Sequence, residues 1–226
     1  MTTSHTHACE SKPCPWQVAQ FVILHVCILG ICGVLLGALA VQFFGGEFPC
    51  PLCLLQRMAM ILTLIGPVFI IVNAHRERMG GFSVWGLGFG MSIVAAVAGM
   101  AISTRQVLLH IAPGDPGYGD PVFGMHLYTW ALVVFIVVIV VSGFMLIFGR
   151  TPVVSPDAGA DEDAPRRLRW YSKATFWLLG IIISVNVLAT FAEAGFHPFL
   201  PDNPDSWRLF ESDSDAGTED QADQSK

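Results

Sequence analysis

Two cysteines and one arginine form the part of this sequence with the clearest chemistry. Residues 48–57 read FPCPLCLLQR, with Cys50 and Cys53 three residues apart and Arg57 four residues further on. On a helix, this spacing places all three side chains on one face, with the two sulfurs close enough to bridge. Thiolates at a helix N-terminus are stabilised by the partial positive charge there. The motif therefore indicates thiol–disulfide redox chemistry, while a structural disulfide or half of a zinc site is the alternative interpretation.

The prolines of the motif indicate where its helix begins. Pro49 and Pro51 suit a first helical turn, where the missing N–H has no helical partner. At about 1.5 Å per residue, Arg57 then lies roughly 10 Å below Cys50. A charged side chain at that depth in an apolar helix is a candidate functional residue that needs a partner. The alternative is that Arg57 extends along the helix toward lipid phosphates.

The elements that carry this motif are membrane helices. Hydrophobic residues make up 53% of the 226 residues and charged residues only 13%, which is too apolar for an ordinary soluble domain. A spanning helix needs roughly 20 mostly apolar residues. Stretches that meet or nearly meet this length are residues 18–44, 52–72, 82–103, 127–148 and 174–192. The first lacks a basic leader and a persuasive cleavage site, so we interpret it as a retained anchor.

The positive charges predict the orientation of these helices, since cytoplasmic loops carry an excess of Lys and Arg. With the N-terminus inside, the cytoplasmic face receives eight of the 12 basic residues: Lys12, Arg76, Arg78, Arg150, Arg166, Arg167, Arg169 and Lys173. The loops on the other face are poor in Lys and Arg. Cys50 and Cys53 are therefore expected to face the oxidising outer side.

The chain divides into membrane and polar segments. The net charge of −6 comes mostly from two stretches rich in acidic and small residues, which is typical of disorder and gives no reason to expect nucleic-acid binding. We expect a cytoplasmic tail over residues 1–16, a four-helix membrane domain over 17–148, a cytoplasmic linker over 149–173, a fifth transmembrane helix over 174–192, and an acidic, disordered outer tail over 193–226.

The sequence CPLCLLQR, at the start of the second of several helices, resembles the disulfide bond formation protein B (DsbB) family of bacterial inner-membrane thiol oxidases. The similarity extends to GMAISTRQVLLHIAP and FGMHLYTW and covers roughly residues 17–148. It implies an all-α integral membrane bundle of four helices, to which this chain is expected to add a fifth, in a bacterial inner membrane with the cysteines facing the periplasm. It also implies an enzyme that oxidises a periplasmic thioredoxin-like (DsbA-like) dithiol protein and passes the electrons to a membrane quinone, ubiquinone or menaquinone.

The same resemblance suggests roles for individual residues. Cys50 and Cys53 match the cysteine pair that forms the catalytic disulfide, and Arg57 matches an arginine at the quinone site. Gln106 falls where many relatives place a quinone-contacting histidine, although glutamine cannot carry a proton as imidazole does. Trp130 matches a tryptophan at the start of the fourth helix and could flank the quinone ring. Alternatively, Trp130 belongs to an interfacial aromatic belt.

The chain departs from this family in one important feature. Members with a full relay carry a second cysteine pair in the second outer loop, but here no cysteine follows Cys53. The chain is therefore a divergent relative for which the two-pair relay cannot be assumed. The alternative function is a non-catalytic paralogue with a structural disulfide, which acts as a membrane scaffold or ligand binder.

The remaining cysteines have simpler interpretations, and we predict no metal site. Cys27 and Cys32 lie five apart within the first helix and are expected to be packing residues. Cys9 and Cys14 lie near two histidines in the N-terminal tail, where reduced thiols are expected on the cytoplasmic side. His25 is expected to be a hydrogen-bonded polar group between helices.

Overall fold

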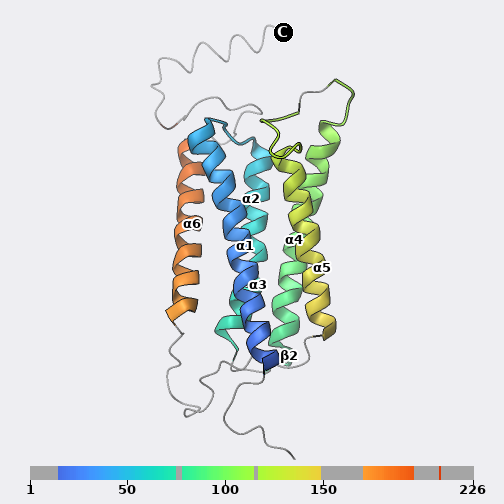
Figure 1. Cartoon of the computed structure of the whole chain (residues 1–226), viewed down its shortest axis with the longest axis vertical. Coiled ribbons are helices and arrows are strands. Elements are labelled where there is room, and N and C mark those ends of the chain that lie inside the picture. Colours follow the sequence, from blue (N-terminus) through green and yellow to red (C-terminus); the bar gives the residue numbers. More distant parts are fainter. Residues whose placement is uncertain (1–14, 75–77, 115–116, 149–169, 196–208, 210–226) are drawn as a thin grey trace, which may run out of the picture.

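The computed structural model describes residues 15–74, 78–114, 117–148, 170–195 and 209. Its described residues form an all-α bundle with five candidate membrane spans (Figure 1). The helices are α1 (Pro15–Gly45), α2 (Pro51–Thr63), α3 (Ile65–Val72), α4 (Val84–Leu109), α5 (Leu127–Phe148) and α6 (Trp170–Ala194). Because α2 and α3 together make one span, the predicted all-α membrane fold with a fifth spanning helix is confirmed.

The span that carries the cysteine motif is divided in two at Leu64 by a proline. Pro67 has no N–H to donate to the carbonyl of Thr63, four residues earlier, so the helix cannot continue unchanged there. Ser92 of α4 donates its hydroxyl to this freed carbonyl at 2.8 Å. Gly66 and Gly88 then allow α3 and α4 to approach closely, since a Cβ on either would collide with the other helix. The motif-bearing helix is thus fixed firmly against α4.

The added helix, α6, packs along α1 on the flank of the bundle (Figure 1). At one end His25 of α1 contacts the Ser172 hydroxyl at 3.0 Å, and at the other end Gln42 of α1 donates to Glu193 at 3.3 Å. His25 is therefore a hydrogen-bonded polar group between helices, as predicted. The helix is longer at both ends than the predicted 174–192. It includes residues 170–173, which were assigned to the linker, and Glu193 and Ala194, which were assigned to the tail.

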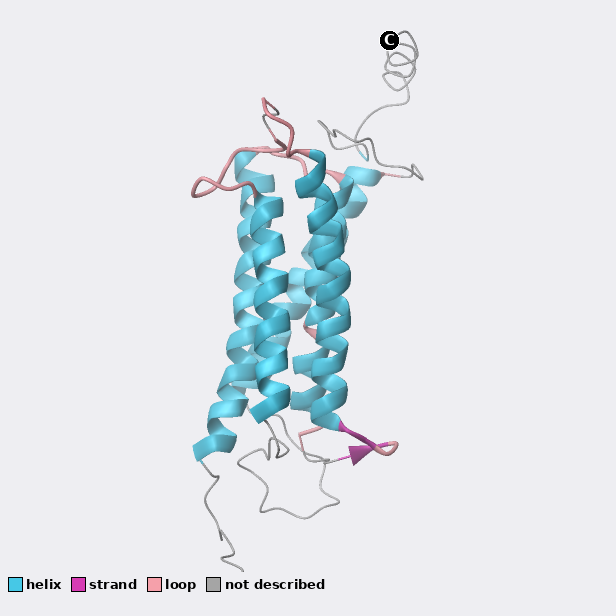
Figure 2. Ribbon diagram, turned by 90° about the vertical axis from the view of Figure 1, so that its right-hand side faces the viewer, coloured by secondary structure: helices cyan, strands magenta, loops and turns pink. Residues whose placement is uncertain are grey.

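The two ends of the bundle differ in structure (Figure 2). At one end the hairpin of β1 (Arg78–Met79) and β2 (Phe82–Ser83) precedes α4, so the predicted third span begins at Val84 and not at residue 82. Ser83 caps α4 by accepting a hydrogen bond from the backbone of Gly86. The opposite end carries the loops before α2 and α5, and the two cysteines lie beneath them.

Candidate functional site

The two cysteines lie at the first turn of α2, at the loop end of the bundle. Cys50 is the N-cap residue, and its sulfur accepts a hydrogen bond from the backbone N–H of Cys53 at 3.3 Å. The two Sγ atoms are 3.0 Å apart, and both cysteines are free thiols in this structure. The hydrogen bond with the Cys53 thiol, helped by backbone N–H groups at the helix start, lowers the pKa of Cys50 to about 6 despite its burial. The pair therefore combines bridging distance with an activated thiol.

Gln106 of α4 contacts both sulfurs. Its Nε2 donates to the Cys50 Sγ at 3.2 Å and to the Cys53 Sγ at 3.3 Å. Its Oε1 accepts from Nε2 of Gln56 at 2.7 Å, which orients the amide with its nitrogen toward the thiols. Gln106 is only 1% exposed. The structure therefore places this residue as a hydrogen-bond donor to the sulfurs.

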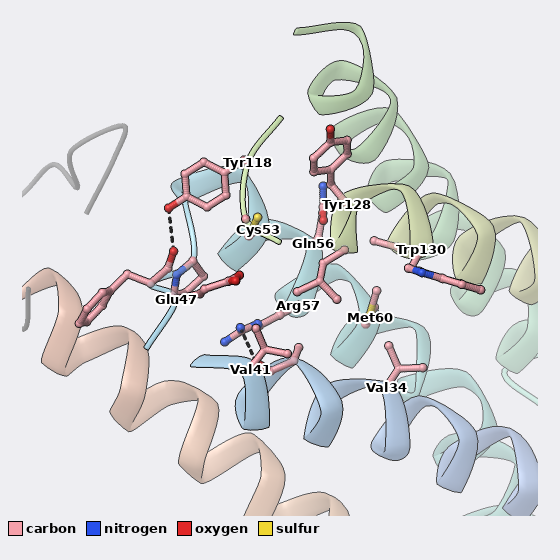
Figure 3. A pocket seen from close by; sticks show the side chains of 16 residues that line it. Val34, Val41, Glu47, Cys53, Gln56, Arg57, Met60, Tyr118, Tyr128 and Trp130 are labelled. Carbon is pink, nitrogen blue, oxygen red and sulfur yellow. Dashed lines mark hydrogen bonds between the residues drawn. The ribbon is translucent and has the colours of Figure 1, made fainter. Parts of the chain in front are cut away.

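Arg57 is held inside the bundle and does not extend to lipid phosphates. It is 8% exposed, and its Nη1 donates to Oε1 of Gln42 at 2.6 Å while its Nη2 donates to the carbonyl oxygen of Ala38 at 3.0 Å. Both acceptors belong to α1, so the guanidinium links α2 to α1. The alternative that Arg57 extends along the helix to lipid phosphates does not fit this geometry. The arginine lies one helical turn beyond Cys53 on the same side of α2 (Figure 3).

A cavity lies between α1, α2 and α5, below the loops (Figure 3). Cys53, Arg57 and Trp130 line it, together with mostly apolar side chains, whereas Cys50 and Gln106 do not. The Trp130 indole donates to the carbonyl of Val122 at 2.9 Å, which fixes the ring at the cavity wall. An apolar groove between α1 and α5 shares Val34 and Trp130 with this cavity.

Two loops meet above the cysteines. The hydroxyl of Tyr118 donates to the carbonyl of Phe48 at 2.7 Å, and the backbone N–H of Asp120 donates to Glu47 at 3.1 Å. Burial raises the pKa of Tyr118, so its hydroxyl remains a neutral donor. Cys50 is only 6% exposed, whereas Cys53 is partly exposed. Cys50 therefore lies behind the loops in this arrangement, although it stands at the mouth of α2, and Cys53 is the more accessible thiol.

Sequence reasoning missed the residues that hold Arg57 and Gln106 in place. Gln42 and Gln56 are polar residues within apolar helices, which is a signal that the sequence did contain. Glu193 was assigned to the tail, although it is fully buried beside Gln42. Cys9 and Cys14 lie outside the described residues, and Cys32 is a core residue of α1, as predicted.

Comparison with known sequences finds a family that matches part of the chain. The sequence model of the family "Disulfide bond formation protein DsbB" matches residues 19–118, the segment that contains the cysteines, Arg57 and Gln106. Residues 19–118 are thus similar to the DsbB family. Together with the five apolar spans, this match supports a multi-pass protein of the bacterial inner membrane.

Curated relatives carry the same family name. The chain is 37% identical over 78 residues to a disulfide bond formation protein B of Chromobacterium violaceum, covering 34% of this chain and 44% of the relative. It is 38% identical over 102 residues to that of Chromohalobacter salexigens, covering 44% and 57%. Disulfide bond formation protein B 1 of Pseudomonas fluorescens is 26% identical over 149 residues, covering 53% and 83%.

The chain spans about half the length of most of the curated relatives that it matches. No solved structure shows significant similarity to it. The DsbB family therefore describes the helices that hold the cysteine motif, and α6 lies outside the matched segment.

Proposed function

We propose that this protein is a membrane thiol oxidase that takes electrons from a periplasmic dithiol protein through Cys50 and Cys53 and delivers them to a membrane quinone. The observation that carries the proposal is that Cys53 and Arg57 line one cavity, with the Cys50 sulfur 3.0 Å behind that of Cys53. A thiol pair at bridging distance, an activated thiol and a buried cation beside an apolar cavity are what such an electron transfer requires.

The cavity and groove fit a quinone by their chemistry. Arg57 offers charged donors to an oxygen, Trp130 offers a flat wall, and the remaining lining is mostly apolar. The adjoining groove is larger, about 410 Å³ against about 90 Å³ for the cavity, and its apolar walls suit a hydrocarbon chain. When bound, a quinone supplies the acceptor for two electrons and two protons.

The protein's own residues divide the remaining work. A partner thiolate attacks Cys50 of the Cys50–Cys53 disulfide, and Cys53 leaves as a thiolate. Gln106 stabilises that leaving group through its Nε2, 3.3 Å from the Cys53 sulfur. The second partner thiol then displaces Cys50, which leaves an oxidised partner and a reduced pair. The cavity-facing position of Cys53 makes it the thiol that passes electrons on.

Access to Cys50 requires the covering loops to separate. The contacts of Tyr118 with Phe48 and of Asp120 with Glu47 hold these loops together over the thiol. With no second cysteine pair to receive electrons outside, a partner must reach the bridge directly. We therefore assign the loops a gating role in which partner docking replaces these contacts.

The experiment that tests the function measures reduction of a soluble quinone by the purified protein supplied with dithiols. We expect turnover in the parent protein and none in the Cys53→Ser variant. The rival function, a non-catalytic scaffold with a structural disulfide, is favoured by the missing second cysteine pair. It predicts no quinone reduction in either protein.

A further inference from the structure

Glu193 is a buried carboxylate at the loop end of α6 that the proposed reaction does not use. It is 0% exposed. Its Oε2 accepts a hydrogen bond from Nε2 of Gln42 at 3.3 Å, while its Oε1 has no hydrogen-bond partner among the described residues. A buried acidic group in an apolar bundle costs folding free energy unless it interacts favourably. Its position therefore calls for a functional explanation.

Gln42 connects this carboxylate to Arg57. A guanidinium can only donate and a carboxylate can accept, so the two neighbours of Gln42 need opposite ends of its amide. Its Oε1 accepts from Arg57 at 2.6 Å, and its Nε2 donates to Glu193 at 3.3 Å. If Glu193 were apolar, Nε2 of Gln42 would lose its acceptor, and the amide would be held at one end only, by its contact with Arg57. The acceptor on α6 thus anchors the far end of the Gln42 amide and holds its Oε1 in place for Arg57.

The orientation of Gln42 determines where the guanidinium lies. Arg57 has two acceptors, Oε1 of Gln42 and the carbonyl of Ala38, and both are uncharged. Loss of the shorter of these contacts would leave Arg57 tethered only through Nη2, free to move within the cavity that Cys53 also lines.

We propose that Glu193 is a positioning residue for Arg57, acting through Gln42, and that α6 is thereby part of the quinone site. This inference rests on the proposed function for its link to quinone. The contribution of Glu193 is its hydrogen-bond acceptor, so a neutral glutamine at this position preserves it. A helix added to the four-helix plan thus completes the hydrogen bonding of a residue that the matched segment already contains.

The test compares Glu193→Leu with Glu193→Gln in the purified full-length protein. Both variants remove the carboxylate charge, but only leucine removes the acceptor. With a soluble quinone as substrate, we expect Glu193→Leu to raise the quinone KM about fivefold, the factor of one lost hydrogen bond, and Glu193→Gln to restore the parent value. Equal KM values for the two variants would overturn the proposal.

A second variant separates positioning from general damage to the fold. In a Gln42→Met background the connecting amide is absent, so Glu193→Leu should cause no further rise in KM. An undiminished rise in that background would show that Glu193 acts by another route, and the proposal would fail.

A measurement without quinone keeps this inference distinct from the proposed function. We expect the ¹⁵N NMR signals of the Arg57 guanidinium, assigned by their loss in Arg57→Lys, to be resolved in the parent and in Glu193→Gln and broadened in Glu193→Leu. If the parent reduces no quinone, the proposed function fails, and these spectra alone decide the positioning role. Identical Arg57 signals in all three proteins would overturn it.

Discussion

Replacement of Cys53 should raise the pKa of Cys50, because the hydrogen bond between the two thiols is the largest cause of its lowered value. Cys53→Ala removes this bond but leaves the backbone N–H groups at the helix start and the donor from Gln106. A hydrogen bond to a charged group contributes roughly 1.5–3 kcal/mol, and one pKa unit corresponds to about 1.4 kcal/mol. We therefore expect the pKa to rise from about 6 by about one to two units.

The assay is the rate of Cys50 alkylation by iodoacetamide as a function of pH. The protein used carries alanine in place of the four cysteines outside the motif, Cys9, Cys14, Cys27 and Cys32. Only the thiolate reacts, so the rate rises through the pKa and then reaches a plateau. In the parent the reactive form is thus present above about pH 6 and is lost below it. The Ala variant should show the same curve moved to higher pH.

Cys53→Ser is the matched control, because its hydroxyl can still donate to Cys50. Its midpoint should lie between those of the parent and of Cys53→Ala. A Cys53→Ala midpoint equal to that of the parent would refute the reasoning, since the lowered pKa would then originate elsewhere.

Three further predictions concern the cation, the loops and the orientation. Arg57→Lys should raise the quinone KM while chemical oxidants still form the disulfide. An unchanged KM would mean that the planar guanidinium, with its several donor nitrogens, is not needed for quinone binding. Tyr118→Phe should increase the alkylation rate of Cys50 roughly fivefold by removing one hydrogen bond between the loops, and an unchanged rate would contradict the gating role. Reporter fusions should place Gly46 outside and Gly80 inside the cell, and an inside location for Gly46 would put the cysteines in a reducing compartment and end the oxidase proposal.

The helices could be predicted because their lengths and their cysteine motif obey local rules. Pro51 occupies the first position of α2, as expected of a residue that has no N–H to donate. The break at Leu64 was missed, although Pro67 is visible in the sequence. The prediction treated residues 52–72 as one uninterrupted span, and the compensating hydroxyl of Ser92 comes from another helix.

The candidate site was predicted in part because some of its contacts are local and others are distant. Cys50, Cys53 and Arg57 lie within eight residues of each other, so helical spacing alone places them on one side. Glu193 lies 151 residues from its partner Gln42. Because it is a charged residue at the end of an apolar stretch, the prediction ended the fifth helix just before it. The contacts of the sulfurs with Gln106, likewise, depend on how α4 packs against α2, which no spacing rule reveals.

The quinone role of Gln106 and Trp130 stays a prediction with different support for each. Trp130 lines the cavity with Arg57, which favours contact with a bound ring. Gln106 instead donates to both sulfurs, and its amide is oriented by Gln56. We therefore expect substitution of Gln106 to affect thiolate reactivity more than quinone binding.

The most direct test of the account is a single turnover under anaerobic conditions. Protein reduced at Cys50 and Cys53, freed of excess dithiol and mixed with a soluble quinone, should form one quinol for each Cys50–Cys53 disulfide found by peptide mass analysis. Cys50→Ser and Cys53→Ser should each abolish this product. Absence of quinol from the parent protein, or quinol formation that survives Cys50→Ser, would contradict the proposal that this pair passes electrons to a quinone.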